Sequence, residues 1–411
     1  MMLRAHGKTI VLLFVTLSCA LLATKTRQEY RSQNKSVQLK ESTVRILFHA
    51  NQCGSRGTDR ATFDYALFGE LFYDMLSFHV FPAHMEHSLQ QRQKLESAFP
   101  GRVIAMPTDG RLWTDNNTFY NSVLTEIVHR FSIHFLYKIE AGWETDQVLA
   151  SIPTVVHAVF ECGVAHGTAM MAISPSVEAH GGSCGGTVPH MVWMPVCAAG
   201  SQKENLRQEL GVSPDSFVFG YYGGEGSWDA GATAIVREVA LQGHNRFAFV
   251  FMNFPPDQAL LLEGLDNVNF LAATNDIYQV CKFGQTIDLY VHTRLIGETF
   301  GLAVAEMSLL GVPTLTSGNT PDQAHIDILQ PDVYIYNSYD SLRDTMLNMS
   351  HATVHQADLA AHYKPFSPFR VMSEFNSKFL NGALTHRQTA ADIGQRLDPT
   401  ELFGNHSELL L

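Results

Sequence analysis

The feature that most constrains this chain is a strand, a glycine-containing turn and a helix that occur in the same order twice. The first copy consists of the apolar segment Val44–Ala50, the turn 51–58 and a segment with helical spacing of apolar residues, 59–76. The second copy consists of the strand and glycine turn 216–224 and the helical segment 229–241. Further short apolar strands alternate with helices in each half. This alternation favours an α/β fold in which helices cover both faces of a parallel sheet.

The length and one irregular segment indicate two domains. A chain of 411 residues is too long for one ordinary core. The segment 178–201 is rich in glycine and proline and interrupts the alternation, so we place the domain boundary at Pro195. The prediction is two Rossmann-like domains, 44–195 and 196–365, that face each other across a cleft. Ligands of such sheets lie beyond the carboxyl ends of the strands, next to helix N-termini.

The N-terminal segment has the pattern of a membrane signal. Arg4 and Lys8 precede the apolar run Thr9–Ala23, and a polar stretch without a hydrophobic period follows. Because the run is shorter than the roughly 20 residues of an ideal span, a cleaved signal and a secreted product remain the alternative. We predict that residues 1–43 are a signal anchor and stalk of a single-pass type II protein, with its folded domains in the lumen of the Golgi or endoplasmic reticulum. Four glycosylation sequons agree with this pathway, at Asn34, Asn116, Asn348 and Asn405.

Composition excludes several classes of protein. Hydrophobic residues make up 45% of the chain and charged residues 17%, which is typical of a folded globular protein. The net charge of -12 leaves no basic surface for nucleic acid. Five cysteines lie outside the apolar run, and this odd number argues against a disulfide scaffold, although one bridge such as Cys162–Cys184 is compatible with it. No two cysteines are spaced as in a zinc motif.

Two glutamates stand in an otherwise apolar segment, Gly297–Gly311. Glu298 lies at the expected entrance of a helix and Glu306 lies inside it. Eight positions on a helix correspond to a rotation of about 80° and a rise of about 12 Å. Two carboxylates at this spacing cannot hold one metal ion, but they can contact two hydroxyl groups of an extended ligand such as a nucleotide sugar. A buried carboxylate needs such a partner, because an unpaired charge in the interior is costly.

The segment 292–318, HTRLIGETFGLAVAEMSLLGVPTLTSG, resembles the donor-site signature of retaining GT-B glycosyltransferases of the family-4 type, also called glycosyl transferases group 1. Weaker similarity extends over most of residues 44–320. The resemblance implies a GT-B fold, in which Glu298 contacts the transferred hexose and Glu306 contacts the ribose of the donor. It also implies that the anomeric configuration is retained. A C-terminal helix in 366–411, for which the spacing of Phe369, Met372, Phe375 and Phe379 is suitable, would return to the first domain.

The site predicted from this resemblance draws on both domains. Glu298 and His157 are the candidate catalytic residues, because His157 ends a strand at the expected cleft; a structural role is the alternative for this histidine, and His166 in the next loop is a weaker candidate. The turn of the first domain is the candidate acceptor or phosphate loop, through Gly54, Gly57 and Thr58, unless it is an ordinary strand-to-helix turn. The candidate donor-binding residues are Arg294, Glu298, Thr299, Phe300, Gly301, Glu306, Gly223 and Gly224.

One segment departs from the family pattern. Members of the family usually place an arginine and a lysine after the first strand of the second domain, where they neutralise the donor diphosphate. Here the segment 219–234 has no basic residue and contains Tyr221 and Glu225 instead. Arg294 and the backbone amides of the glycine turn are the predicted substitutes. The alternative is a catalytically weak or inactive relative that binds sugars or a partner protein.

These observations predict a retaining glycosyltransferase that moves a hexose from a nucleotide sugar to a hydroxyl of a glycan, glycoprotein or lipid acceptor. The chain has no Asp-x-Asp triplet, the motif with which GT-A enzymes hold a divalent ion. We therefore expect no metal and no cofactor other than the donor. A dinucleotide oxidoreductase is disfavoured, because neither opening strand is followed by G-x-G-x-x-G.

Overall fold

The computed structural model describes most of the chain after its N-terminal segment. The described residues are 43–106, 118–144, 148–149, 151–182, 184–194, 204–224, 226–354 and 357–381. The predicted anchor Thr9–Ala23, the predicted domain boundary at Pro195, Glu225 and the tail after residue 381 lie outside them.

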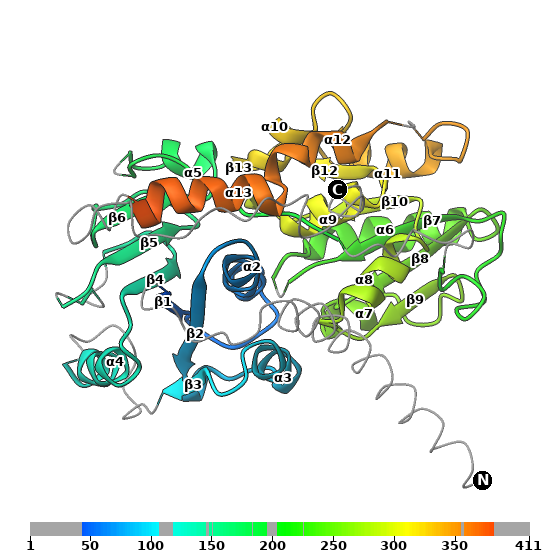
Figure 1. Cartoon of the computed structure of the whole chain (residues 1–411). Coiled ribbons are helices and arrows are strands. Elements are labelled where there is room, and N and C mark those ends of the chain that lie inside the picture. Colours follow the sequence, from blue (N-terminus) through cyan, green and yellow to red (C-terminus); the bar gives the residue numbers. More distant parts are fainter. Residues whose placement is uncertain are drawn as a thin grey trace, which may run out of the picture.

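The first domain contains a parallel six-stranded sheet in the order β3-β2-β1-β4-β5-β6 (Figure 1). Its strands are β1 (Val44–His49), β2 (Met75–Pro82), β3 (Val103–Met106), β4 (Phe135–Glu140), β5 (Thr154–Ala158) and β6 (Ala169–Ala172). Its helices are α2 (Gly57–Phe72), η1 (Ala83–Met85), α3 (Leu89–Ala98), α4 (Thr118–Phe131) and α5 (Pro175–Ala179). Strand β1 lies in the middle because the chain adds strands on one side of it and then returns to add strands on the other side.

The second domain repeats this plan with the order β14-β12-β10-β7-β8-β9. Its strands are β7 (Phe217–Tyr222), β8 (Phe247–Met252), β9 (Val268–Leu271), β10 (Leu289–His292), β12 (Thr314–Ser317) and β14 (Tyr334–Tyr336), and two short strands, β11 (Gly297–Glu298) and β13 (Asp322–Gln323), pair separately. Its helices are α6 (Ala230–Gln242), α7 (Pro256–Leu260), α8 (Ile277–Gly284), α9 (Leu302–Leu309), α10 (Ala324–Leu329), α11 (Tyr339–Asn348) and α12 (Leu359–Tyr363).

Each sheet has a point at which the strand order reverses, between β1 and β4 in the first domain and between β7 and β10 in the second. Ligands of open parallel sheets bind beyond the carboxyl ends of the strands at such a point. In the second domain, the glycine turn Gly223–Gly224 follows β7, and Glu298 follows β10. The fold therefore places both predicted donor-binding segments at the expected edge of the same sheet.

The C-terminal segment leaves the second domain and packs on the first. After η2 (Lys364–Phe366), helix α13 (Pro368–Phe375) continues into the single π-helical turn Asn376–Leu380 and contacts α2 (Figure 1). The ring of Phe375 stacks on that of Tyr65, with centroids 5.1 Å apart, and Phe379 meets Tyr137 edge-on. A segment that follows the second domain in sequence thus completes the core of the first.

Replacing Phe375 with leucine should lower the free energy of unfolding by about 1 kcal/mol, because an apolar swap of similar size in a packed core loses contacts without leaving a large cavity. The matched control is Phe369→Leu on the same helix, since Phe369 is 49% exposed and its replacement should change stability by less than about 0.5 kcal/mol. Urea denaturation of the full chain measures both. Equal losses at the two positions would contradict the packing of α13 on the first domain.

The predicted location of the protein is not supported. Among the residues that the structure describes, no helix is long and apolar enough to cross a membrane. This finding contradicts the prediction of a type II membrane protein in the secretory pathway, and we withdraw that prediction. The apolar run Thr9–Ala23, on which the prediction rested, lies outside the described residues.

One cysteine pair is bonded in the first domain. The disulfide Cys162–Cys184 joins the loop after β5 to the loop after α5, with 5.3 Å between the Cα atoms. This is the bridge that the sequence analysis regarded as compatible with the cysteine count. The thiol of Cys53 is buried and free.

Candidate functional site

The two glutamates of the predicted donor site lie on either side of the entrance to α9. Glu298 ends the short strand β11, which pairs with β13, and Glu306 lies inside the helix. Between them Gly301 adopts a left-handed backbone conformation, with φ of 87°. A Cβ atom there would lie 3.2 Å from the side chain of His325 and 3.3 Å from that of Glu298. Glycine therefore allows the chain to turn into the helix directly beside the Glu298 carboxylate.

The carboxylate of Glu298 is held by two basic side chains. Its Oε1 lies 3.1 Å from His292 Nε2, and its Oε2 accepts a hydrogen bond of 2.9 Å from Arg294 Nη1. Burial by itself would raise the pKa of this carboxyl. The hydrogen bond from His292 and the charges of His292 and Arg294 outweigh burial, and they hold the pKa below its usual value. Glu298 is thus ionised at neutral pH and keeps 18% of its side chain accessible.

A second layer of side chains orients His292. The hydroxyl of Thr316 lies 2.9 Å from His292 Nδ1 and 2.9 Å from His325 Nε2, so it links the two rings. His325 is fully buried, and burial is the largest cause that lowers its pKa to about 3, which keeps the ring neutral. His292, Thr316 and His325 were not predictable as site residues, because they come from three different elements and no local spacing connects them.

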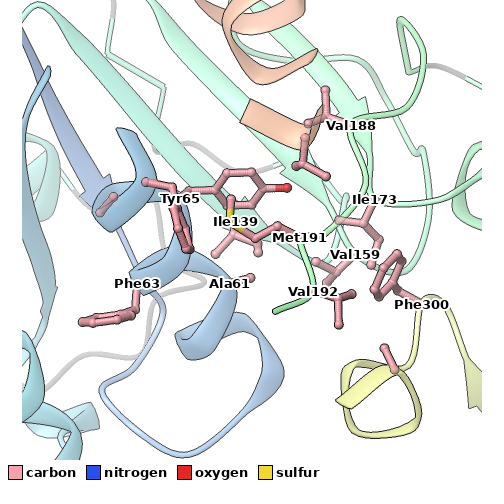
Figure 2. Packing of buried hydrophobic residues seen from close by; sticks show 14 of the residues in the cluster. Ala61, Phe63, Tyr65, Ile139, Val159, Ile173, Val188, Met191, Val192 and Phe300 are labelled. Carbon is pink, nitrogen blue, oxygen red and sulfur yellow. The ribbon is translucent and has the colours of Figure 1, made fainter. Parts of the chain in front are cut away.

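Arg294 does not face the glycine turn as a free cation, because its guanidinium is paired with Glu298. Phe300, another predicted donor-binding residue, is buried in apolar packing between the domains. Its ring lies near Val159 and Val192 of the first domain (Figure 2). Thr299 is buried beside it. Arg294 therefore lies beside Glu298 as predicted from the sequence, whereas Phe300 serves the apolar packing between the two domains.

Glu306 faces the first domain. Its Oε1 lies 3.6 Å from Arg60 Nη1 of helix α2, and the hydroxyl of Tyr222 also hydrogen-bonds to its carboxylate. Arg60 in turn donates a hydrogen bond of 2.7 Å to Asp64 and stacks over the ring of Trp193 at 5.1 Å. Burial raises the pKa of the Glu306 carboxyl above its usual value, against the opposing charges of Arg60 and Lys94. The predicted ribose-binding carboxylate is thus covered by a cation that sequence reasoning missed.

In the glycine turn after β7, the two tyrosines that precede the glycines face opposite sides of the sheet. Tyr221 does not face the cleft, because its side chain is buried against Trp228 and Phe254 in the second-domain core. The next residue, Tyr222, faces the opposite side, toward Glu306. The carbonyl of Gly223 accepts a hydrogen bond of 2.7 Å from Asn253 Nδ2, and the carbonyl of Gly224 accepts one of 3.2 Å from the amide of Ser227.

The turn between β1 and α2 in the first domain is held together by the side chain of Asp59. Asp59 accepts hydrogen bonds from the backbone amides of Gly54 and Arg56, each at 3.2 Å, and from Gln52 Nε2 at 2.9 Å. The amide of Gly54, one of the three residues predicted to contact phosphate or acceptor, is therefore engaged within the turn. The Thr58 carbonyl accepts a hydrogen bond of 2.8 Å from the hydroxyl of Thr62 within α2.

Gly57, the first residue of α2, lies against the beginning of α9. A Cβ atom at Gly57 would stand 3.5 Å from Leu302 Cδ1, the first residue of α9. The N-termini of these two helices, one from each domain, are therefore neighbours. Helix N-termini favour anions, and two such ends lie close together at this contact.

His157 does not face the cleft as predicted. It is fully buried, its Nδ1 lies 2.8 Å from the Tyr137 hydroxyl and its Nε2 lies 2.6 Å from the Val188 carbonyl. Its ring lies among aromatic rings that include Tyr65 and Phe379. The prediction went wrong because β5 is buried along its whole length, so the end of the strand is part of the core. The geometry favours the structural alternative for this histidine.

The burial of His157 predicts a pH dependence of stability. Burial lowers its pKa from 6.5 to about 4. Between these values the unfolded chain binds a proton that the folded chain does not bind, so stability falls as pH falls from 6.5 toward 4. Replacing His157 with glutamine should reduce the slope of unfolding free energy against pH in this range by about 1 kcal/mol per pH unit. Tyr137→Phe, which keeps the buried imidazole, is the control and should retain the slope. Equal slopes in the His157 variant and the natural chain would show that this ring reaches solvent.

His166, the weaker candidate, lies in the loop after β5 and pairs with Glu140 Oε1 at 2.7 Å. Among the described residues, no group of three or more His, Cys, Asp or Glu side chains is placed to hold a metal ion. Metal independence itself stays a prediction.

No family model matches this chain, and no curated protein matches it. Solved structures share its fold. HepE from Anabaena, in complex with UDP and glucose, aligns with a TM-score of 0.63 at 13% identity, and the alignment covers 82% of this chain and 100% of HepE. WaaG, a glycosyltransferase involved in lipopolysaccharide biosynthesis, aligns with a TM-score of 0.60 at 13% identity and coverage of 81% and 99%.

A glycosyltransferase from Rickettsia africae aligns with a TM-score of 0.58 at 12% identity and coverage of 84% and 96%. Identities this low show a shared fold and nothing further. With its two parallel sheets, the chain has the GT-B fold, and the predicted fold is confirmed.

Proposed function

We propose that this protein is a glycosyltransferase that uses a nucleotide sugar as donor. The observation that carries the proposal is the placement of Glu298 and Glu306 on either side of the α9 entrance, at the carboxyl edge of the second sheet of a GT-B fold. HepE, which shares this fold, has been solved with UDP-glucose. We infer that the donor lies with its sugar at Glu298 and its ribose toward Glu306.

The proposed mechanism is retaining and independent of metal ions. The ionised carboxylate of Glu298, oriented by His292 and Arg294, accepts hydrogen bonds from hydroxyls of the transferred hexose. As the glycosidic bond loosens, the N-terminus of α9 stabilises the charge that develops on the leaving diphosphate. The acceptor hydroxyl attacks the anomeric carbon from the face that the diphosphate leaves, and its proton passes to an oxygen of the departing diphosphate. The acceptor class is a hydroxyl of a glycan, glycoprotein or lipid.

A screen of nucleotide sugars tests this function. The full-length protein is mixed with UDP-, GDP- and ADP-sugars, and thermal unfolding and release of the nucleoside diphosphate are both measured. A true donor at 100 times its dissociation constant should stabilise the fold by about 2.7 kcal/mol, and it should be consumed slowly by water even without an acceptor. Proton NMR of the product then reports its anomeric configuration. If no donor stabilises the fold and none releases its nucleoside diphosphate, the proposal is refuted.

An inactive sugar- or partner-binding relative is the second candidate. Two observations favour it. Among the described residues, no basic side chain occurs between Phe217 and Arg237. In addition, Arg60 already covers Glu306. Stabilisation by a nucleotide sugar without release of the diphosphate would select this candidate.

A further inference from the structure

The donor diphosphate needs positive charge that the second domain does not supply in the usual place. The described part of the turn after β7 has no basic side chain, and Arg294 is held by Glu298. The next cations toward the cleft belong to the first domain. Arg60 lies on α2, and Lys94 on α3 contributes its charge to the surroundings of Glu306.

Arg60 is placed at the junction of two helix N-termini. Gly57 and Leu302, the first residues of α2 and α9, are in contact, and Arg60 follows Gly57 by about 4.5 Å along the helix axis. The side chain of Arg60 is 16% exposed, and its guanidinium is held by Asp64 and by the face of Trp193. A phosphate at the N-terminus of α9 would therefore lie within one helical turn of this side chain.

Arg60 and a ribose cannot use Glu306 at the same time. The carboxylate of Glu306 is 5% exposed, and Arg60 and Tyr222 contact it. Ribose hydroxyls that bind to it must first displace Arg60. The displaced guanidinium stays charged, because arginine does not lose its proton in proteins. Asp64 still pairs with its Nε, but Nη1 has lost the carboxylate that it faced and is available to another anion.

We propose that Arg60 exchanges partners when the donor binds. In the free protein it pairs with Glu306, and in the complex the ribose takes Glu306 while Arg60 turns to the diphosphate. Asp64 accepts a hydrogen bond from Nε of the guanidinium in both states, and the two Nη groups of the planar fork are suited to phosphate oxygens. Arg60 is then the residue of the first domain that replaces the missing basic residues of the second. The inference rests on the proposed function of the donor site.

The test compares a nucleoside with its diphosphate by isothermal titration calorimetry on the full-length protein. The probes are uridine and UDP, with adenosine and ADP as a second pair. In Arg60→Gln, we expect uridine to bind several-fold more tightly, because its competitor for Glu306 is gone. The ratio of UDP to uridine affinity should fall about 10-fold, because a charge-assisted phosphate contact is lost. Arg92→Gln, which removes an arginine paired with Glu86 and Glu96 on α3, is the control and should change neither quantity.

Each other outcome overturns the exchange. Tighter uridine binding with an unchanged UDP to uridine ratio would mean that Arg60 only covers the site. Equal losses for both ligands would mean that Arg60 orients Glu306 and never leaves it. If the natural protein binds none of the four probes, both the proposed function and the exchange are wrong. In the first two outcomes the natural protein does bind the probes, so only the exchange is wrong. Should Arg60→Gln fail to fold, Arg60→Lys keeps the charge but loses the planar fork, and the ratio should fall by a smaller factor.

Discussion

Replacing Glu298 with glutamine should reduce turnover about 10- to 150-fold and leave the affinity for the nucleoside diphosphate within about twofold. The amide keeps the shape of the side chain and removes its charge, so the sugar loses a charge-assisted hydrogen bond of about 1.5–3 kcal/mol. His292 and Arg294 would then face a neutral group that no longer orients the hexose. The nucleoside diphosphate carries no hexose and should bind nearly as before.

Glu306→Gln should have the opposite pattern. Because the ribose contact exists with or without the sugar, this change should weaken nucleoside binding by about 10-fold. The control for both variants is Glu263→Gln, an exposed carboxylate of the second domain away from α9. Steady-state kinetics with the donor found by the screen and calorimetry with the diphosphate measure the two effects at matched foldedness. If both variants lose diphosphate affinity equally, the two roles are not divided between Glu298 and Glu306.

Replacing Lys138 with methionine should destabilise the protein by about 3–5 kcal/mol, because it leaves a buried carboxylate without one of its partners. The ammonium of Lys138 is fully buried and lies 2.7 Å from Glu140 Oε2, and His166 contacts the other oxygen. Burial alone would raise the pKa of Glu140. The hydrogen bond from His166 and the charge and hydrogen bond of Lys138 instead lower this pKa from 4.5 to about 2. At pH 7 the carboxylate is thus charged in both the folded and the unfolded chain.

Chemical denaturation at pH 7 measures this loss. The double variant Lys138→Met/Glu140→Gln should recover part of it, because no unpaired charge is left in the interior. Lys282→Met, at a surface pair with Glu204, is the control and should leave the transition midpoint unchanged. A loss below about 1 kcal/mol for Lys138→Met would show that water reaches this pair. The lowered pKa of Glu140 also predicts that the folded protein loses stability in acid. As pH falls from 4.5 toward 2, the unfolded chain takes up a proton at this carboxylate before the folded chain does, so the free energy of unfolding falls.

The architecture was predictable because it follows from local periodicity. Alternating strands and helices with a glycine turn in each half require two covered parallel sheets, and both sheets are present. The period of two along β7 also separates Phe217, Phe219 and Tyr221, which are buried in one cluster, from Tyr222. That alternation is visible in the sequence, and it distinguishes the buried Tyr221 from Tyr222, which faces Glu306.

The electrostatic environment of the site was not predictable, because it depends on residues far apart in the chain. The pairing of Arg60 with Glu306 joins α2 to α9 across the two domains. Likewise, the link from Glu298 through His292 and Thr316 to His325 requires the actual packing of β10, β12 and α10. A local motif identifies the carboxylates, but the three-dimensional structure decides which charges surround them.

The return of α13 to the first domain has a consequence for the order of folding during synthesis. The ribosome releases the first domain before the second, yet Tyr65 and Tyr137 of the first domain are covered by Phe375 and Phe379. Until the whole second domain has been made, that apolar surface has no partner. The nascent first domain can build its sheet early, but its final packing must wait for α13, and during that interval it is a natural client for chaperones.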